Sequence, residues 1–275
     1  MAKALPVVAA IPNFNMGESL RNLIPQVLAQ GYDRVFVLDD ASTDHTVDVV
    51  SDFGDDVHLV RNPENRGAGA NRNQIIDQVE DGAIIHFIDA DMDLETAEIP
   101  TVARELFERY ADRGVGLIGG LVSRKDGSQE PLNYGAVFSV WGTLSGAYVV
   151  VDRYRERPRL AATMGRLAAP IAKDWPNILA PPIAAPAYWV HEGNMLVYST
   201  VFRSLGGYDP ILRSHEAQDL AIRLEKMGVK RQFDPRISVI HHHIDVRGKN
   251  RSKWENKAVV YLIRKHGLVR FLTER

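Results

Sequence analysis

The sequence predicts an α/β fold built on a mostly parallel, doubly wound sheet flanked by helices. Short apolar segments alternate with amphipathic segments about every 20 to 30 residues in the first half of the chain. Strands and helices that alternate in this way form parallel sheets. Polar clusters follow the apolar segments, and an open α/β sheet binds its ligand beyond the carboxyl ends of its strands.

Five apolar strands are expected in the first half of the chain, at residues 5–11, 34–38, 57–61, 84–88 and 115–118. The segments between them repeat apolar residues every three or four positions, which is typical of amphipathic helices. These helices are expected at residues 18–30, from about 45, at 68–79 and at 95–113. Pro12 stops the first strand, Gly31 ends the first helix, and Thr43 or Asp44 would cap the second.

The alternation breaks down after Gly119, where Gly, Pro, Ala and aromatic residues become frequent, and we expect helices and loops that cover one side of the site. Regular elements return near Asn194. They are a strand at 194–198, a turn at 206–209, a helix at 217–227, a strand at 236–240 and a basic helix at 252–265.

Composition excludes several classes of protein. The net charge of −2 and the near-neutral pI argue against binding of nucleic acid, which needs a basic excess. The absence of cysteine excludes disulfides, thiolate nucleophiles and cysteine-based zinc sites. Residues 1–6 lack the pattern of a signal peptide, so a cytoplasmic protein is expected. The basic helix at 252–265 leaves peripheral membrane contact open.

Four successive strands end in polar side chains, which parallel pairing would bring to one edge of the sheet. The clusters are Asn13 with Asn15, Asp39 with Asp40, Asn65 with Arg66, and Asp89 with Asp91.

The run from Asp89 to Asp93 places three carboxylates at alternate positions directly after an apolar strand. Buried carboxylates need partners, and here a divalent cation with its diphosphate would serve. An EF-hand loop does not fit, because Leu94 and Pro100 stand where it requires Gly and Glu. An aspartyl-phosphate phosphatase would have Thr or Val at Asp93, and a solvated turn remains the simplest alternative.

Three further motifs allow a functional and a structural interpretation. The Gly67–Gly69 turn lacks the third glycine of a dinucleotide fingerprint, so binding of NAD is not expected. Arg72 on the following helix could bind a diphosphate. The structural alternative is that Arg72 is a surface arginine. Alternation places His241 and His243 on one face, where imidazole could bind a transition metal or stabilise the fold. Glu216 and Asp219 open a helix, either as macrodipole partners or as a general base.

Taken together, these residues resemble family 2 glycosyltransferases of the GT-A fold. The resemblance covers about residues 5–123 and 191–245. It is carried by five motifs in order, namely residues 10–15, the "DDGSTD"-like run at 37–44, the "N-x-G…ARN"-like run at 65–73, the DxD-like 89–91, and the "GGFD…EDxDLxxR"-like block at 206–223.

The resemblance implies a metal-dependent enzyme that moves a sugar from a nucleoside-diphosphate sugar, most often a UDP-sugar, to an acceptor hydroxyl. Residues 1–123 would form the donor-binding half and 124–275 the acceptor-side half of one continuous domain. The donor-binding residues would be Pro12, Asn13, Asn15, Asp39, Asp40, Asn65, Gly67, Arg72, Asp89 and Ala90. Asp91, His241 and His243 would bind Mn or Mg, and Glu216 and Asp219 would be catalytic.

One position departs from the family pattern. Inverting relatives carry their catalytic Asp where this chain has Ala217, and the Glu216–Asp219 spacing is similar to that of retaining GT-A enzymes. Inversion is our preference, with retention and a catalytically silent nucleotide-sugar binding protein as alternatives. The acceptor, whether glycan, lipid-linked or small molecule, and the oligomeric state are not defined by the sequence.

Overall fold

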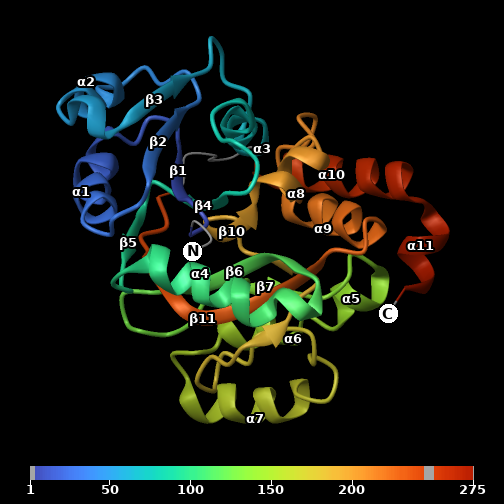
Figure 1. Cartoon of the computed structure of the whole chain (residues 1–275). Helices are drawn as coiled ribbons and strands as arrows, with labels where there is room; N and C mark the ends of the chain where they lie inside the picture. The colour runs from blue at the N-terminus through green and yellow to red at the C-terminus, as the bar shows by residue number, and fades with distance from the viewer. Residues whose placement is uncertain (1–3, 245–250, 275) are drawn as a thin grey trace.

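Nine strands form one mixed sheet within residues 4–244 and 251–274, the part of the chain that the computed structural model describes (Figure 1). Residues 1–3, which bore on the signal-peptide prediction, and Asp245, the last residue of the resemblance, lie outside it. The strands are β1 (Val7–Asn13), β2 (Arg34–Asp39), β3 (His58–Arg61), β4 (Ile84–Ile88), β5 (Met92–Leu94), β6 (Val115–Ser123), β8 (Ala185–Pro186), β10 (Asn194–Tyr198) and β11 (Lys230–His241).

The strand order is β3-β2-β1-β4-β10-β6-β11-β5, with β8 on the side of β11. Strands β3, β2, β1 and β4 are parallel, as the sequence predicted. Strand β10 runs antiparallel between β4 and β6, while β11 is parallel to β6 and antiparallel to β5. The predicted α/β class is confirmed. The antiparallel β10 also brings the residues that precede it to the edge where β4 ends.

Helices cover both faces of this sheet and β7 (Tyr134–Gly135) pairs with β9 (Trp189–Val190) beside it. The helices are α1 (Gly17–Leu28), α2 (Thr46–Ser51), α3 (Ala68–Arg72), α4 (Ile99–Tyr110), α5 (Val140–Leu144), α6 (Ala147–Asp152), α7 (Pro158–Ala168), α8 (Ser199–Ser204), α9 (Glu216–Lys226), α10 (Arg251–His266) and α11 (Leu268–Thr273), with 3-10 turns η1 (Gly54–Asp56), η2 (Asn73–Asp77) and η3 (Ala111–Arg113). Within the described residues, no helix is both long and apolar enough to cross a membrane.

The alternation of side chains along β1 explains the three layers. Val8 and Ala10 face a cluster that includes η2, α8 and α9, whereas Ala9 and Ile11 face α1 and α2. Helix α4 packs on the second face through Leu106 and its neighbours. Figure 1 shows α1 and α2 on one side of the sheet, α8 to α10 on the other, and α7 at the far end of the molecule. The hydrophobic packing on the two faces of the sheet fixes the strand ends that carry the polar clusters.

Several element boundaries differ from the expectation. The helix expected at 68–79 is α3 followed by the 3-10 turn η2, and the helix expected at 95–113 begins at Ile99. Glu98 precedes that helix with a left-handed φ of 52°, and Pro100 occupies its first turn, so the chain cannot be helical earlier. Strand β11 begins at Lys230 rather than at residue 236, because it pairs along nearly the whole length of β6.

Candidate active site

The ends of β1 and β2 meet in a buried polar cluster. The amide of Asn13 donates to Asp39, with 3.3 Å between Nδ2 and Oδ1, and to the hydroxyl of Ser42. Asp39 is fully buried, accepts from the backbone N–H of Ser42, and forms an ion pair with Arg61 whose Nε lies 3.1 Å from Oδ2. Arg61 is half exposed, so its positive charge reaches the surface while Asp39 stays buried.

Asp40 orders the loop after β3. Its two carboxylate oxygens accept from the amide of Asn62 at 2.9 Å and from the backbone N–H groups of Arg66 and Gly67 at 2.8 Å. A buried carboxylate without hydrogen bonds would be costly, so the loop must keep the position in which it makes these three. Asp40 therefore determines the shape of the loop that follows β3.

The same loop is pinned from the second half of the chain. The guanidinium of Arg213 donates to Asn65 Oδ1 at 2.7 Å. Gly67 has a φ of 89°, and a Cβ there would lie 2.7 Å from Arg213 Cδ, so only glycine fits. On the β1 side, Asn15 accepts from the backbone N–H of Thr43 at 2.8 Å and itself has a left-handed φ of 53°.

Arg72 is the cation at the centre of the site. It is 3% exposed and donates from Nη2 to Asp89 Oδ1 at 2.5 Å. Burial lowers its pKa, but the charges of Asp89, Glu192 and Glu216 outweigh this effect and keep the guanidinium protonated. Its Nε is buried and makes no hydrogen bond within the described part of the chain. A buried guanidinium with an unused N–H donor can be satisfied by an incoming anion.

Asp91 and His241 are brought together by strand pairing. Strand β11 pairs with β5 so that His241 opposes Met92, one residue after Asp91. His241 Nε2 lies 3.3 Å from Asp91 Oδ2, which also accepts from the backbone N–H of Ile244 at 2.9 Å. Burial lowers the pKa of His241, but the neighbouring carboxylates of Asp91 and Glu130 raise it to about 10 overall. His241 thus carries a proton, or a cation in its place.

The sequence did not identify Glu130, which completes this cluster. Glu130 Oε1 lies 2.6 Å from His243 Nε2 and 3.6 Å from His241 Nδ1, and the three residues could share one metal ion. Despite these short distances, neither Glu130 Oε1 nor His241 Nδ1 has the geometry of a hydrogen bond in the described part of the chain, and both atoms are buried. The carboxylate and imidazole donors fit a divalent transition ion such as Mn better than Mg.

The three consecutive histidines divide as strand alternation predicted. His241 and His243 both face Glu130, with ring centroids 4.1 Å apart. His242 faces the other way and its Nε2 lies 2.7 Å from Asp93 Oδ2. Asp93, the third acid of the run, also accepts from the side chain of Gln26. Asp93 and His242 therefore connect β5 and β11 and lie outside the candidate metal cluster.

A second group that the sequence did not identify precedes β10. Gly193 accepts from the backbone N–H of Asp89 at 3.1 Å, and a Cβ on Gly193 would lie 2.5 Å from Asp89 Oδ2. This contact places His191 and Glu192 beside Asp89 and Arg72, whose charges act on them. These residues could be found only by expecting β10 to be antiparallel, because its first residues, rather than its last, then reach the site.

Glu216 and Asp219 take different positions although they share the first turn of α9. The buried Glu216 lies against Gly69 of α3, where an added Cβ would be 3.0 Å from its Cγ, and its charge acts on Arg72. Asp219 is fully buried and turns towards α10, where it accepts from Lys265 and His266, both at 2.7 Å.

The pKa of Asp219 reflects these partners. Burial raises it, but hydrogen bonds from His266 and Lys265 and the charge of Arg223 lower it far below the ordinary value. Its carboxylate is thus a weak base that stabilises the contact between α9 and α10. Ala217, between the two acids, is partly buried.

The remaining expected residues contribute backbone shape. Pro12 pairs with Leu38 in the register of β1 and β2, and Ala90 is 2% exposed within the apolar cluster under α1. At the carboxyl end of β4 the structure pairs Arg72 with Asp89 and His241 with Asp91, and the charge of Asp89 also acts on His241.

Solved structures with this architecture are GT-A glycosyltransferases. A mannosyltransferase from Pyrobaculum calidifontis, solved with GDP-Man and Mn2+, has 19% identity and a TM-score of 0.59, over 96% of this chain and 65% of its own. GalNAc-T7, solved with UDP, GalNAc and Mn2+, has 16% identity and a TM-score of 0.59, over 88% and 44%. TarS from S. aureus, solved with UDP-GlcNAc, has 13% identity and a TM-score of 0.55, over 88% and 60%.

The class of the fold is therefore that of the GT-A transferases. Residues 8–129 match the sequence model described as glycosyl transferase family 2. This match agrees with the resemblance that the motifs indicated. The chain spans 44% to 65% of the length of the three solved proteins. No curated protein matches the sequence.

Proposed function

We propose that this glycosyltransferase transfers a sugar from a nucleoside-diphosphate sugar to an acceptor hydroxyl with the help of a divalent cation. One observation carries the proposal. The buried Arg72 is held by Asp89 and has an unused Nε donor, and two residues after Asp89 the carboxylate of Asp91 pairs with the imidazole of His241. A diphosphate needs such a cation, and carboxylate and imidazole ligands suit a metal bound to it.

The proposed roles follow from these positions. Arg72 binds the diphosphate oxygens, and Asp89 holds the guanidinium in place. Asp91, His241, His243 and Glu130 would hold the ion, which would act as a Lewis acid on the departing diphosphate. The polar cluster of Asn13 and Asp39 and the loop shaped by Asp40 would receive the nucleoside.

Glu216 is the better candidate for the catalytic base. In that role its carboxylate accepts the proton of the acceptor hydroxyl while the oxygen forms its bond to the sugar C1 and the bond to the diphosphate breaks. Asp219 is held by Arg223, Lys265 and His266, so we give it a stabilising role. Inversion follows from a single displacement at C1. Product with retained anomeric configuration, measured by NMR, would contradict the base role of Glu216.

The donor class can be tested by thermal shift with UDP, GDP and their sugars, each with and without Mn2+. We expect one nucleotide to raise the melting temperature only with the metal. Asp91→Asn should abolish that shift, while Asp93→Asn, a matched change in the same run, should preserve it. A shift that does not depend on the metal, or that survives in Asp91→Asn, would refute the metal part of the proposal.

Ala217 favours one alternative, a nucleotide-sugar binding protein without transfer activity. It predicts the same thermal shifts but no release of nucleoside diphosphate in the presence of any acceptor. Release of UDP or GDP that Glu216→Gln abolishes would exclude this alternative. The cytoplasmic location remains a proposal from the sequence, and so does the division into donor and acceptor halves at residues 123 and 124.

A further inference from the structure

Helix α7 presents an unusual outer face. Its inner face is made of small residues, since Ala161, Gly165 and Ala168 are buried against the cluster of α6. Its outer face exposes Leu160 to 40% and Leu167 to 75%. These two leucines are seven positions apart and so lie on the same side of the helix.

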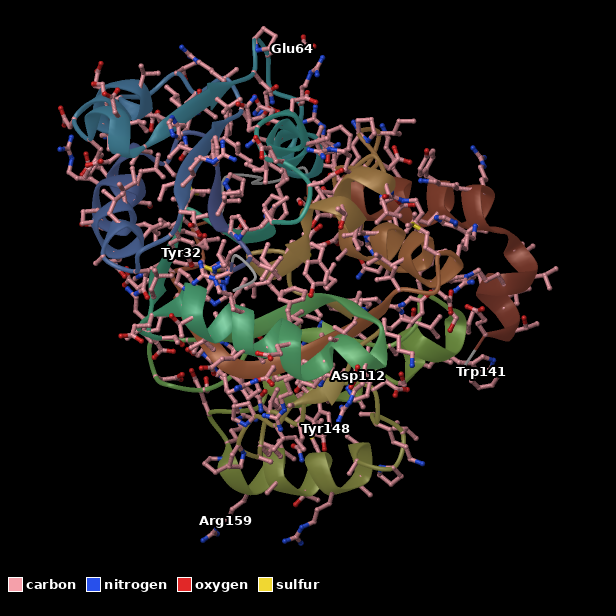
Figure 2. The ribbon with its side chains drawn as sticks, viewed as in Figure 1. Tyr32, Glu64, Asp112, Trp141, Tyr148 and Arg159 are labelled. Carbon is pink, nitrogen blue, oxygen red and sulfur yellow. The ribbon has the colours of Figure 1, made fainter. Side chains whose placement is uncertain are left out.

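The apolar side chains are surrounded by positive charge. Between Arg153 and Lys173 the chain has six basic residues and one acidic residue, Glu156, whereas the whole chain has a net charge of −2. All seven charged side chains are exposed: Arg153, Arg155, Glu156, Arg157, Arg159, Arg166 and Lys173. Arg159, in the first turn of α7, points away from the body of the molecule (Figure 2). The segment is thus a local cationic surface on a nearly neutral protein.

The acidic residues at its borders do not cancel this charge. Asp152 forms a bidentate ion pair with Arg124, at 2.8 and 3.0 Å. Asp174 is exposed at the other end. Arg124 also lies 3.8 Å from Glu130 of the candidate metal cluster. The ion pair of Asp152 therefore fixes the end of α6, and with it the orientation of α7, relative to the candidate active site.

We propose that the outer face of α7, with Ile171 beyond its end, is a docking surface for an anionic lipid bilayer. A helix that exposes leucines among arginines is typical of segments that lie in the membrane interface, where apolar side chains enter the acyl boundary and arginines meet the headgroups. A second copy of this chain fits poorly, because two such surfaces would repel each other. Among the described residues of the basic helix α10, which the sequence suggested for this role, Leu262 is buried and the exposed large apolar side chains are Trp254 and Val260.

The test measures binding of the full chain to vesicles of phosphatidylcholine with phosphatidylglycerol, and of phosphatidylcholine alone, by co-sedimentation. We expect binding only to the anionic vesicles, weakening with salt. The triple variant Arg157→Gln, Arg159→Gln, Arg166→Gln should bind about a hundredfold more weakly, at about fivefold per arginine. The matched control, Lys253→Gln, Lys257→Gln, Arg264→Gln on α10, removes the same charge and should bind like the wild type.

A second variant tests the apolar part of the surface. Leu160→Ser with Leu167→Ser should weaken vesicle binding at every salt concentration without changing the slope of the salt dependence. Unchanged thermal unfolding shows that each variant is folded, since all these side chains are exposed. Equal binding of the wild type to both kinds of vesicle, or to neither, would overturn the proposal. So would loss of binding in the α10 variant alone, or concentration-dependent dimerisation that the α7 variants abolish.

Discussion

Replacing Asp219 by Asn tests whether the two acids of α9 have different roles, structural for Asp219 and, as we propose, catalytic for Glu216. The carboxylate is fully buried and contacts Arg223, Lys265 and His266, each at 2.7 Å. The amide keeps the shape but loses the charge, so Arg223, Lys265 and His266 lose their common partner. We therefore expect a large loss of stability and little direct effect on the chemistry.

The size of the loss follows from the burial of the partners. Removing one member of a buried ion pair costs about 3–5 kcal/mol. Arg223 and Lys265 retain 18% and 27% exposure and keep some hydration, so the lower limit of about 3 kcal/mol applies. An entropy of unfolding of about 2.1 cal/mol/K per residue converts this loss into a fall of about 5 °C in melting temperature.

The assay compares Asp219→Asn with Glu216→Gln by thermal unfolding, by nucleotide binding and by sugar transfer below both melting temperatures. Glu216→Gln should keep its nucleotide affinity but lose transfer by about 10²–10⁴-fold, the usual contribution of a general base. Asp219→Asn should melt earlier and keep most of its activity. The reasoning is refuted if Asp219→Asn melts like the wild type yet loses transfer as severely as Glu216→Gln.

Three further predictions follow from the buried groups around the site. Burial lowers the pKa of His86 to about 4, so the unfolded chain binds a proton at this residue before the folded chain does as the pH falls below about 6.5. The free energy of unfolding should therefore drop by about 2 kcal/mol between pH 7 and pH 5. Urea unfolding of His86→Gln should show a free energy that depends less on pH. Gly193→Ala should displace Asp89 and weaken nucleotide binding in calorimetry by about tenfold, a loss of about 1.4 kcal/mol, and wild-type affinity would show that the contact does not matter. Glu130→Gln should weaken Mn2+ binding to the nucleotide-free chain by about 10–100-fold, measured by metal titration, with Asp93→Asn as the unaffected control.

The sequence predicted where the polar residues at the ends of the parallel strands lie, because local patterns determine their positions. Each parallel strand of the first half ends in its polar residues, so the position of Asp39 or Asp89 in the chain already gives its position at the edge of the sheet. Alternation after β11 likewise separated His242 from His241 and His243. These predictions required only the direction of a strand and the face on which a side chain lies.

The residues that the sequence missed depend on non-local pairing. His191 and Glu192 reach the site only because β10 runs antiparallel beside β4, and an apolar segment does not show its direction. Glu130 lies in the irregular segment and is placed by its backbone hydrogen bond to Val122. The stabilising role of Asp219 depends on the packing of α10, forty-odd residues later in the chain.

The same pairing gives the candidate metal cluster its composite origin. Glu130 belongs to the segment after β6, and His241 and His243 lie at the end of β11 and just after it. Asp91, which pairs with His241, follows β4. The cluster therefore forms only when β11 has paired with both β6 and β5. A bound cation would connect all three segments and stabilise this part of the sheet, because it binds the folded chain and not the separated segments. Metal binding, nucleotide binding and folding of the acceptor side should consequently be coupled.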